Sequence, residues 1–343
     1  MSERSKDLIA ILLLLVFGAL VWWFLYLVFA ESSSKPFDKP IIVEIPHGAT
    51  SRAVARILAE NGVLLRLNLF VLVAKITGFE SKLRAGYFRF KYRPSVWRCL
   101  RMLTRGGSFD VKITIPEGFT IYEIAGLAQR ELGVDSVSFL QACRDTAILR
   151  KYGIDAPSME GFLFPETYLV PKGISSESLI AIFHHEFRRR WRPEWSARAE
   201  SLGLTLEQVV TLASIIEAEA HVKDEQGVIS SVYHNRLKLG MPLQADPTAA
   251  YGLAKINEPV TPEDLRSKTP YNTYIYRGLP PGPICNPGED AIKAALYPES
   301  TDYLYFVSRM DGTHIFSKTL KEHNKAINRV RRLIKVNKAK SKI

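Results

Sequence analysis

The stretch "TLEQVVTLASIIEAEAH", residues 205–221, reads as a long apolar helix with two carboxylates near its end. Thr205 and Gln208 have the spacing of a capping box, which fixes the helix register. At about 100° per residue, one broad face collects Leu206, Val209, Val210, Ala213, Ile216 and Ala220. Glu217 falls inside this face and Glu219 falls on the other side. The pattern predicts a buried helix with one acidic side chain held against apolar neighbours.

Two explanations of Glu217 remain open at this point. Loss of hydration disfavours the charged carboxylate, so the pKa of Glu217 is expected to be raised. A carboxyl group that keeps its proton at neutral pH can act as a general acid. The alternative is a structural glutamate paired with a buried arginine or with backbone donors, because ion-pair networks also perturb carboxylates.

Length and charge exclude some classes of protein. The chain has 343 residues, 47% of them apolar, which suffices for a membrane anchor and two domains. Its net charge of +11 would by itself suggest nucleic acid or a membrane surface as partner. Seven of these charges lie in an acid-free tail: Arg329, Arg331, Arg332, Lys335, Lys338, Lys340 and Lys342. The rest of the chain is then expected to be mildly basic, with no nucleic-acid partner.

A second basic run, residues 188–192, is interleaved with aromatic side chains. It is expected to be a solvated helix face, and a patch for an anionic ligand is the alternative. The three cysteines are odd in number and lack C-x-x-C spacing, so buried thiols are expected instead of disulfides or a zinc site. The histidines show no H-E-x-x-H pattern, and no metal or other cofactor is expected.

The segment from Leu8 to Ala30, "LIAILLLLVFGALVWWFLYLVFA", carries no charge. At 1.5 Å per residue it would extend about 34 Å, enough to cross a bilayer. A retained anchor is therefore expected. A cleaved signal peptide is the alternative, because Val28 and Ala30 resemble a cleavage site, but the apolar region is too long and too aromatic for one. Lysine and arginine occur on both sides, so charge does not fix the orientation.

Two later stretches repeat one pattern. "IPHGATSRAVARILAENG" from Ile45 and "IPEGFTIYEIAGLAQREL" from Ile115 share Ile-Pro-x-Gly-x-Thr at an offset of 70 residues. Each predicts a strand, a glycine turn and a helix capped near the threonine or the following residue. Duplication and convergent capping chemistry both explain the likeness.

The remaining pattern mixes helices with short strands. Between the two repeats lie a helix up to Gly78, an alternating strand "AGYFRFKY" and a helix closed by glycine. Long helices are then expected over 175–191 and 206–220, followed by a loop-rich stretch over 242–288. Two strands surround the turn at 310–312. This order predicts an α+β fold.

Five segments, in this order, closely resemble the YceG-like, or MltG, family of endolytic murein transglycosylases. They are "MEGFLFPETYLVPKG" (159–173), "ASIIEAEA" (213–220), "NRLKLGMPLQADPTAAYGL" (235–253), "YNTYIYRGLPPGPICNPG" (271–288) and "HIFSKTLKEHN" (314–324). The resemblance covers Ile41 to Arg332. It implies a cytoplasmic N-terminus 1–7, a transmembrane helix 8–30, a linker 31–40, a LysM-like subdomain 41–108, a catalytic transglycosylase domain 109–332 and a basic tail 333–343.

By this resemblance Glu217 matches the catalytic glutamate. The side chains expected to bind sugar are Gln244, Asp246, Asn272, Thr273, Tyr274, Glu160, Glu166, Tyr168 and Glu219. Turn or cap duty is the alternative for each, since Asp246-Pro247 and Asn272-Thr273 are ordinary turn formers. Glu219 either tunes Glu217 or faces solvent. The chain departs from the family pattern at Ala218, often lysine, and at Ala245, often threonine; neither change removes a carboxylate.

The resemblance implies a lytic reaction that uses one carboxylate. The acid protonates the oxygen between N-acetylmuramic acid and N-acetylglucosamine, then accepts the proton of the muramic C6 hydroxyl as a 1,6-anhydro ring closes. The implied partners are peptidoglycan strands and peptidoglycan synthases, at the bacterial cytoplasmic (inner) membrane with the catalytic domain outside. The alternatives are a hydrolytic muramidase, a non-catalytic peptidoglycan-binding tether and, from the tail alone, a nucleic-acid binder.

Overall fold

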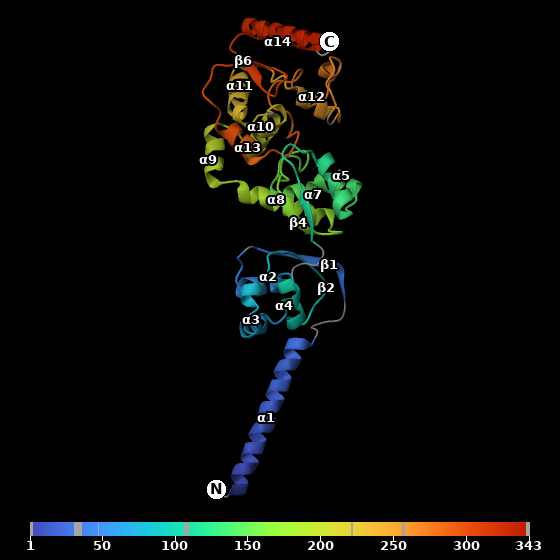
Figure 1. The fold of residues 1–343 in the computed structure, drawn as a ribbon, viewed down its shortest axis with the longest axis vertical. Coiled ribbons are helices and arrows are strands. Elements are labelled where there is room, and N and C mark those ends of the chain that lie inside the picture. The colour runs from blue at the N-terminus through green and yellow to red at the C-terminus, as the bar shows by residue number, and fades with distance from the viewer. Residues whose placement is uncertain are drawn as a thin grey trace. The chain divides into compact units, whose positions relative to one another are not determined.

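The computed structural model describes residues 3–30, 36–46, 48–105, 110–220, 222–255 and 258–340. The chain forms two compact units, Met1–Ile113 with Tyr168–Ile174, and Thr114–Thr167 with Ser175–Ile343 (Figure 1). In the described ranges, helices alternate with three two-stranded sheets, which confirms the mixed α+β class.

The first unit contains one long helix, three shorter α-helices, a 3-10 turn and four strands among its described residues. These are α1 (Glu3–Phe29), β1 (Pro36–Ile45), α2 (Ser51–Glu60), α3 (Leu67–Ile76), η1 (Glu80–Lys82), β2 (Gly86–Tyr92), α4 (Val96–Arg105), β3 (Asp110–Thr114) and β4 (Thr167–Pro171). β1 pairs antiparallel with β2, and β3 pairs with β4. The return of β4 to this unit was not expected from the sequence.

The core of the first unit lies between the β1–β2 ribbon and its helices. Phe88 and Phe90 alternate with exposed Arg89 on β2, so one face of the ribbon is apolar. That face packs on Leu58 of α2 and Phe70 of α3 within one buried cluster. The helices predicted before Gly78 and after the alternating strand are confirmed as α3 and α4.

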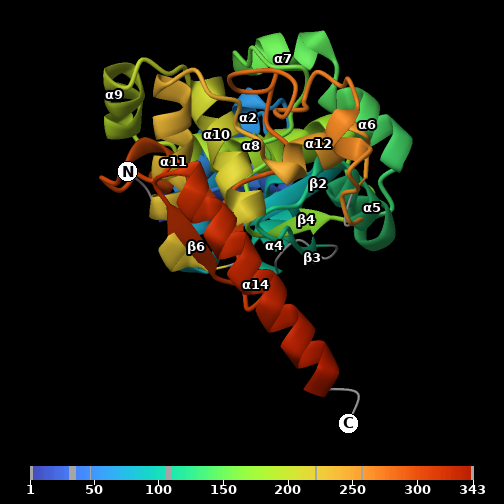
Figure 2. The ribbon, with the colours of Figure 1, turned by 90° about the horizontal axis from the view of Figure 1, so that it is seen from above.

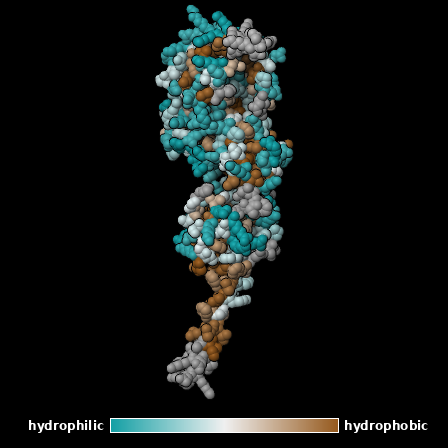
Figure 3. Space-filling view, in the orientation of Figure 1, coloured by the Kyte–Doolittle hydropathy of each residue, from teal (hydrophilic) through white to brown (hydrophobic). Residues whose placement is uncertain are grey.

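α1 has the length and the apolar composition to cross a membrane over Ile11–Phe29, a window of 19 residues. Only 6% of that window is buried by other parts of the protein. Apolar residues follow one another along its described part in Figure 3. Its last turn differs from the rest, because Val28 is buried in the cluster of the first unit.

The second unit is mainly helical. Its elements are α5 (Ile121–Leu132), α6 (Ser136–Cys143), α7 (Thr146–Tyr152), α8 (Ser176–Arg190), α9 (Pro193–Ser201), α10 (Leu206–Glu219), η2 (Lys223–Glu225), α11 (Gln226–Lys238), α12 (Asp246–Gly252), η3 (Asp264–Arg266), α13 (Glu289–Leu296), β5 (Tyr305–Ser308), β6 (His314–Ser317) and α14 (Leu320–Lys340). α10 lies at the centre and packs on α11, α12 and α13. Ala291 and Ala295 are fully buried on α13, and such small residues let two helices approach closely.

The predicted helix caps are confirmed. Thr50 accepts a hydrogen bond from the Ala53 N–H at the start of α2, and Thr120 forms a capping box with Glu123 at the start of α5. The two repeated stretches therefore share the same local capping chemistry, although α2 and α5 belong to different units. The three cysteines are free and buried, as expected.

The C-terminal hairpin and helix complete the second unit. β5 pairs antiparallel with β6 from Tyr305↔Ser317 to Ser308↔His314, which confirms the strands predicted around residues 310–312. α14 packs on this hairpin through its first turns, and its later turns project from the unit (Figure 2).

Gly161 provides a test of the packing around α10. Its φ is +85°, and an added Cβ would lie 2.6 Å from Pro283 and 2.7 Å from Val210 of α10. We expect Gly161→Ala to lower the free energy of unfolding by about 3 kcal/mol or more, because backbone strain adds to overpacking. Urea denaturation would measure this.

Gly153→Ala is the matched control. Gly153 also has a positive φ, +68°, but its added Cβ would meet no atom within 4 Å. Strain alone predicts a loss of about 1 kcal/mol. Equal losses for the two variants would show that the contact among Gly161, Pro283 and Val210 is not tight.

Candidate active site

α10 carries the candidate acid at the point where the helix leaves the core. The predicted capping box is present between Thr205 and Gln208. Burial extends beyond the predicted apolar face. Every residue of 209–216 is buried, so this part of the helix is covered on all sides. Glu217 is the first residue beyond this run and is half-buried. Its place is thus explained by the end of the buried run and not by an amphipathic face.

One oxygen of Glu217 is fixed by the backbone. The Gly288 N–H donates to Glu217 Oε2 at 3.1 Å. Within the described part of the chain, Oε1 accepts no hydrogen bond. Burial raises the pKa of Glu217, and the negative charges of Glu117 and Asp290 raise it further. The Gly288 N–H and the Lys223 ammonium act in the opposite direction.

A cluster of charges lies beside this carboxylate. Lys223 Nζ is 3.1 Å from Glu117 Oε2 and 2.8 Å from Asp290 Oδ2. Both acids raise the pKa of Lys223, so the lysine keeps its charge. Glu117 follows the Ile-Pro of the second repeat, and Asp290 lies in the first turn of α13. Among the described residues, two anions and one cation therefore lie near Glu217.

Gly288 is tied to both glutamates. An added Cβ at this position would lie 2.1 Å from Glu117 Oε1, so the carboxylate of Glu117 fills the space that any other side chain would need. The same residue supplies the N–H that holds Glu217. Gly288 thereby brings two carboxylates to one backbone segment.

Glu219 lies in a second polar cluster on the other side of α10, as its helical position predicted. Tyr233 OH donates to Glu219 Oε1 at 3.1 Å. Burial raises the pKa of Glu219 to about 7, and the charge of Asp246 adds to this, while Tyr233 and Arg236 oppose it. The alternative that Glu219 simply faces solvent does not hold, because the residue is half-buried and hydrogen-bonded.

Three further predicted residues meet around this second cluster. Tyr274 OH donates to Asp246 Oδ1 at 2.5 Å, and Arg236 Nη1 donates to Gln244 Oε1 at 3.3 Å. Gln244 and Asp246 are exposed, and Gln244 has a φ of +54°, which is uncommon for a residue other than glycine. Backbone strain of this kind is frequent at functional sites.

Glu160 lies elsewhere, sealed inside the second unit with 1% of its surface exposed. Its carboxylate accepts hydrogen bonds from the Ile121 N–H at 3.0 and 3.1 Å, from Asn286 Nδ2 at 2.9 Å and from Tyr251 OH at 3.0 Å. Burial raises its pKa to about 8, against the hydrogen bonds of Ile121 and Tyr251. These contacts give Glu160 a structural role.

Asn272 and Thr273 are also buried and are satisfied by protein groups. The Asn272 amide donates to the carbonyls of Leu265 and Ser267 at 3.1 and 2.8 Å. Thr273 Oγ1 accepts from the Ala245 N–H at 3.1 Å, which holds the loop that carries Gln244 and Asp246. Both residues act as supports beneath the exposed cluster.

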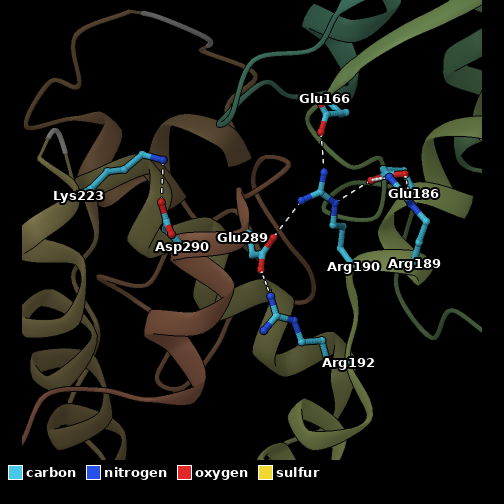
Figure 4. A network of polar contacts seen from close by, with 8 residues as sticks. All are labelled: Glu166, Glu186, Arg189, Arg190, Arg192, Lys223, Glu289 and Asp290. Carbon is cyan, nitrogen blue, oxygen red and sulfur yellow. Dashed lines mark hydrogen bonds and ion pairs between the residues drawn. The ribbon is translucent and has the colours of Figure 1, made fainter.

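The last two predicted residues are Tyr168 and Glu166. Tyr168 lies on β4 in the first unit and is buried. Glu166 joins a network of ion pairs around Arg190, whose Nη2 is 2.7 Å from Glu166 Oε2 (Figure 4). The same guanidinium contacts Glu186 at 2.7 Å and Glu289 at 3.2 Å.

This network adds acidic partners to the basic run. Arg189 pairs with Glu186 at 2.8 Å, and Arg192 pairs with Glu289 at 2.5 Å. The expected solvated face is confirmed, because Arg188 is exposed and the side chains of Arg189 and Arg192 are 64% and 53% exposed. Acidic partners of Arg189, Arg190 and Arg192 argue against a patch open to an anion. Figure 4 also shows Lys223 and Asp290 on the neighbouring elements.

Comparison with known proteins decides the family. The profile of the YceG-like family matches residues 43–329. The chain belongs to the YceG-like family. A protein of Bacillus subtilis named endolytic murein transglycosylase is 32% identical over 319 residues, which cover 87% of this chain and 88% of that protein.

Two further relatives agree with this assignment. A Streptococcus pneumoniae protein of the same name is 27% identical over 329 residues, covering 87% of this chain and 59% of that longer protein. The crystal structure of a YceG-like protein from Listeria monocytogenes superposes with a TM-score of 0.59 at 31% identity, covering 84% of this chain and 99% of the other.

Sequence reasoning missed Glu117, Lys223, Asp290 and Gly288. A signal for Glu117 was present, because the second repeat has a glutamate where the first has His47. Such a difference within an otherwise shared turn points to a role beyond the turn itself. Lys223 and Asp290 gave no local signal, since only the fold brings η2 and α13 together.

Glu160→Ala tests the structural role of Glu160. The change leaves the Ile121 N–H and the Asn286 amide buried without their acceptor, and each unsatisfied group is costly. We expect the free energy of unfolding to fall by about 3–5 kcal/mol.

Glu166→Ala is the control from the same motif. Its side chain is 41% exposed and its ion pair with Arg190 is shared with two other acids. A loss below about 1 kcal/mol is expected in the same denaturation experiment. A stable Glu160→Ala protein with weakened glycan binding would instead return Glu160 to the substrate-binding residues.

Proposed function

We propose that the chain is an endolytic murein transglycosylase, a lyase that cuts the bond between N-acetylmuramic acid and N-acetylglucosamine within glycan strands. The names of the relatives in Bacillus subtilis and Streptococcus pneumoniae support the substrate class. The observation that carries the proposal is the state of Glu217: a half-buried carboxyl with a raised pKa, one oxygen held by Gly288 and the other unengaged within the described chain.

The first step is general acid catalysis. Protonated Glu217 donates its proton to the bridging oxygen as the bond from that oxygen to C1 of the muramic sugar breaks. The bond's electrons leave with the oxygen, which becomes the hydroxyl of the departing N-acetylglucosamine. Positive charge grows on C1, and the anionic carboxylate left on Glu217 lies close enough to stabilise it.

The second step returns the proton. The C6 hydroxyl of the same muramic sugar attacks C1 and passes its proton to Glu217, so a 1,6-anhydro ring forms and the acid is regenerated. No water is consumed. Because the nucleophile is part of the sugar, its tethering replaces a second catalytic group, an effect that reaches about 7–11 kcal/mol in well-oriented systems.

The neighbouring carboxylate supports this single-acid scheme. A hydrolase of the usual kind needs a second carboxylate as base or nucleophile. Glu117 and Asp290 are anions near Glu217, but both are bound to Lys223, at 3.1 and 2.8 Å, and Glu117 is also packed against Gly288. That placement suits an electrostatic role in holding the proton on Glu217 better than attack on a sugar or activation of water.

The second cluster supplies the proposed sugar contacts. Gln244, Asp246 and Tyr274 present an amide, a carboxylate and a phenol, which suit sugar hydroxyls and acetamido groups. Glu219 lies beside them with a pKa near 7. The buried residues Asn272 and Thr273 hold this surface in place and leave sugar contact to the exposed groups.

The location is part of the proposal. α1 anchors the chain in the cytoplasmic membrane with the second unit on the extracytoplasmic side, where newly made peptidoglycan lies. The first unit is assigned as the LysM-like subdomain, and peptidoglycan synthases are proposed as partners. The apolar span Ile11–Phe29 and the family membership support these assignments.

Glu217→Gln tests the acid. Glutamine keeps the size of the side chain but has no acidic proton, so cleavage of purified glycan strands should fall by a factor of about 100 to 10,000. Mass spectrometry of the wild-type digest should show anhydromuramic ends. Thermal melting of both proteins controls for folding.

Other product patterns would overturn the assignment. Wild-type fragments whose reducing ends all carry an added water would identify a hydrolytic muramidase. A Glu217→Gln protein with full activity in the digest would exclude this residue as the acid. A wild-type protein that binds strands and cuts none would be a tether.

Glu117→Gln and Lys223→Ala form a matched pair with opposite expected effects. Glu117 raises the pKa of Glu217 and Lys223 lowers it. Since the acid must be protonated to donate, activity is lost as pH rises through this pKa. The alkaline limb of the pH profile of kcat/KM should move to lower pH in Glu117→Gln and to higher pH in Lys223→Ala.

A merely structural role would not move the limb in this way. If both variants lose activity while the alkaline limb of the pH profile stays unchanged, Glu117 and Lys223 only stabilise the loop. Shifts in the same direction would contradict the electrostatic explanation.

A further inference from the structure

The first unit carries a concentrated positive charge that the total charge of the chain conceals. Between residues 36 and 105 there are thirteen lysines and arginines against four acids, a net charge of +9. The chain outside its tail is mildly basic as a whole, as expected, but its positive charge is unevenly distributed. With +7 in the tail, the rest of the protein has a small negative balance.

Within the first unit, the end of α1 is in direct contact with the elements that follow it. Arg66 Nη1 donates to the Leu27 carbonyl at 2.6 Å, and Val28 is 3% exposed. The ring of Phe29 lies 5.4 Å from that of Trp97, which stacks on Phe79 at 5.5 Å. The last turn of the apolar helix is thus part of the core of this unit.

These contacts fix the depth of the first unit if α1 spans a membrane. The 19-residue window Ile11–Phe29 is about 28 Å long at 1.5 Å per residue, close to the roughly 30 Å of a hydrocarbon core. Trp22, Trp23 and Tyr26 precede its end, and such residues favour the membrane interface. The residues packed on Val28 and Phe29 must therefore lie at the level of the lipid headgroups.

α3 lies at this level and exposes apolar side chains. Arg66, which contacts Leu27, directly precedes α3, and Phe79, which stacks on Trp97, closely follows it. Leu72 and Ile76, one helical turn apart, are 47% and 69% exposed, and Leu65 is 60% exposed. Lys75 is exposed beside them.

We propose that this face of α3 docks on the surface of the bilayer that α1 crosses. Leu65, Leu72 and Ile76 lie at the boundary between headgroups and acyl chains, where the apolar face of an interfacial helix is buried. Lys75, exposed on the same face, lies against anionic lipid headgroups, which attract lysine and arginine near a membrane surface. The first unit is then a peripheral membrane domain, and the inference rests on the proposed anchoring by α1.

Depth-dependent quenching in vesicles tests this proposal with the full-length chain. The three native cysteines are buried, so single cysteines at Leu72→Cys and Ile76→Cys can be labelled selectively with a fluorophore. Nitroxide groups attached near the headgroup end of the acyl chains should quench both labels several-fold more than a control label. The vesicles contain phosphatidylcholine and phosphatidylglycerol.

Arg89→Cys is the control within the same unit. Arg89 is exposed on β2 between Phe88 and Phe90, whose side chains face the core, so its own side chain faces away from the helices. Leu25→Cys, within the proposed span, is the positive control. Quenching at Leu25 with none at Leu72 or Ile76 above the Arg89 level would overturn the docking and leave the anchor intact.

The remaining outcomes separate the parts of the inference. No quenching at Leu25 would overturn the anchoring and the docking together, while cleavage by Glu217 would be tested independently. In vesicles of phosphatidylcholine alone, quenching at Leu72 and Ile76 should fall and that at Leu25 should not; unchanged quenching would exclude a role for headgroup charge. Protection of the Leu72 label by soluble glycan strands, or cross-linking between two copies, would assign the face to glycan or to a dimer and overturn the proposal.

Discussion

The hydrogen bond between the buried side chains of Glu160 and Asn286 holds the candidate site together. Asn286 also accepts from the Leu163 N–H at 3.0 Å and donates to the Phe119 carbonyl at 2.8 Å, while Glu160 accepts from Ile121. Three segments far apart in the sequence are thereby joined around two side chains. Buried networks of this kind are stable only when every group has its partner, so the loop beside α10 has one arrangement. Glu217 receives its backbone donor from that loop.

The position of Glu217 balances opposing electrostatic effects. A carboxyl sealed in the core, as Glu160 is, cannot reach a substrate, whereas a fully hydrated one loses its proton near pH 4. Glu217 lies between these extremes, because the buried run of α10 ends one residue before it. Nearby acids hold its proton, and Lys223 with the Gly288 N–H stabilises the anion that forms when the proton leaves. Both protonation states therefore have support from the same small set of groups.

The sequence predicted features that depend on neighbours along the chain. The capping boxes, α10, the alternating strand β2 and the final hairpin all follow from local spacing. Burial around the whole of α10 was not predicted, because a helical pattern shows one face and cannot show how many elements cover the others. The roles of Glu160 and Lys223 depend on contacts across 126 and 67 residues. Family resemblance pointed to Glu217 as the candidate acid, but the resemblance alone could not separate buried side chains such as Asn272 from exposed groups such as Asp246.

The close approach of Glu117 to Gly288 links two positions that are 171 residues apart in the sequence. A methyl group at position 288 would push the Glu117 carboxylate out of its present place beside Lys223. Among related chains, replacement of this glycine should coincide with a shorter residue in place of the glutamate. The two positions are then expected to vary together, because their side chains compete for the same space. A relative changed at both positions has lost the carboxylate that raises the pKa of Glu217 here.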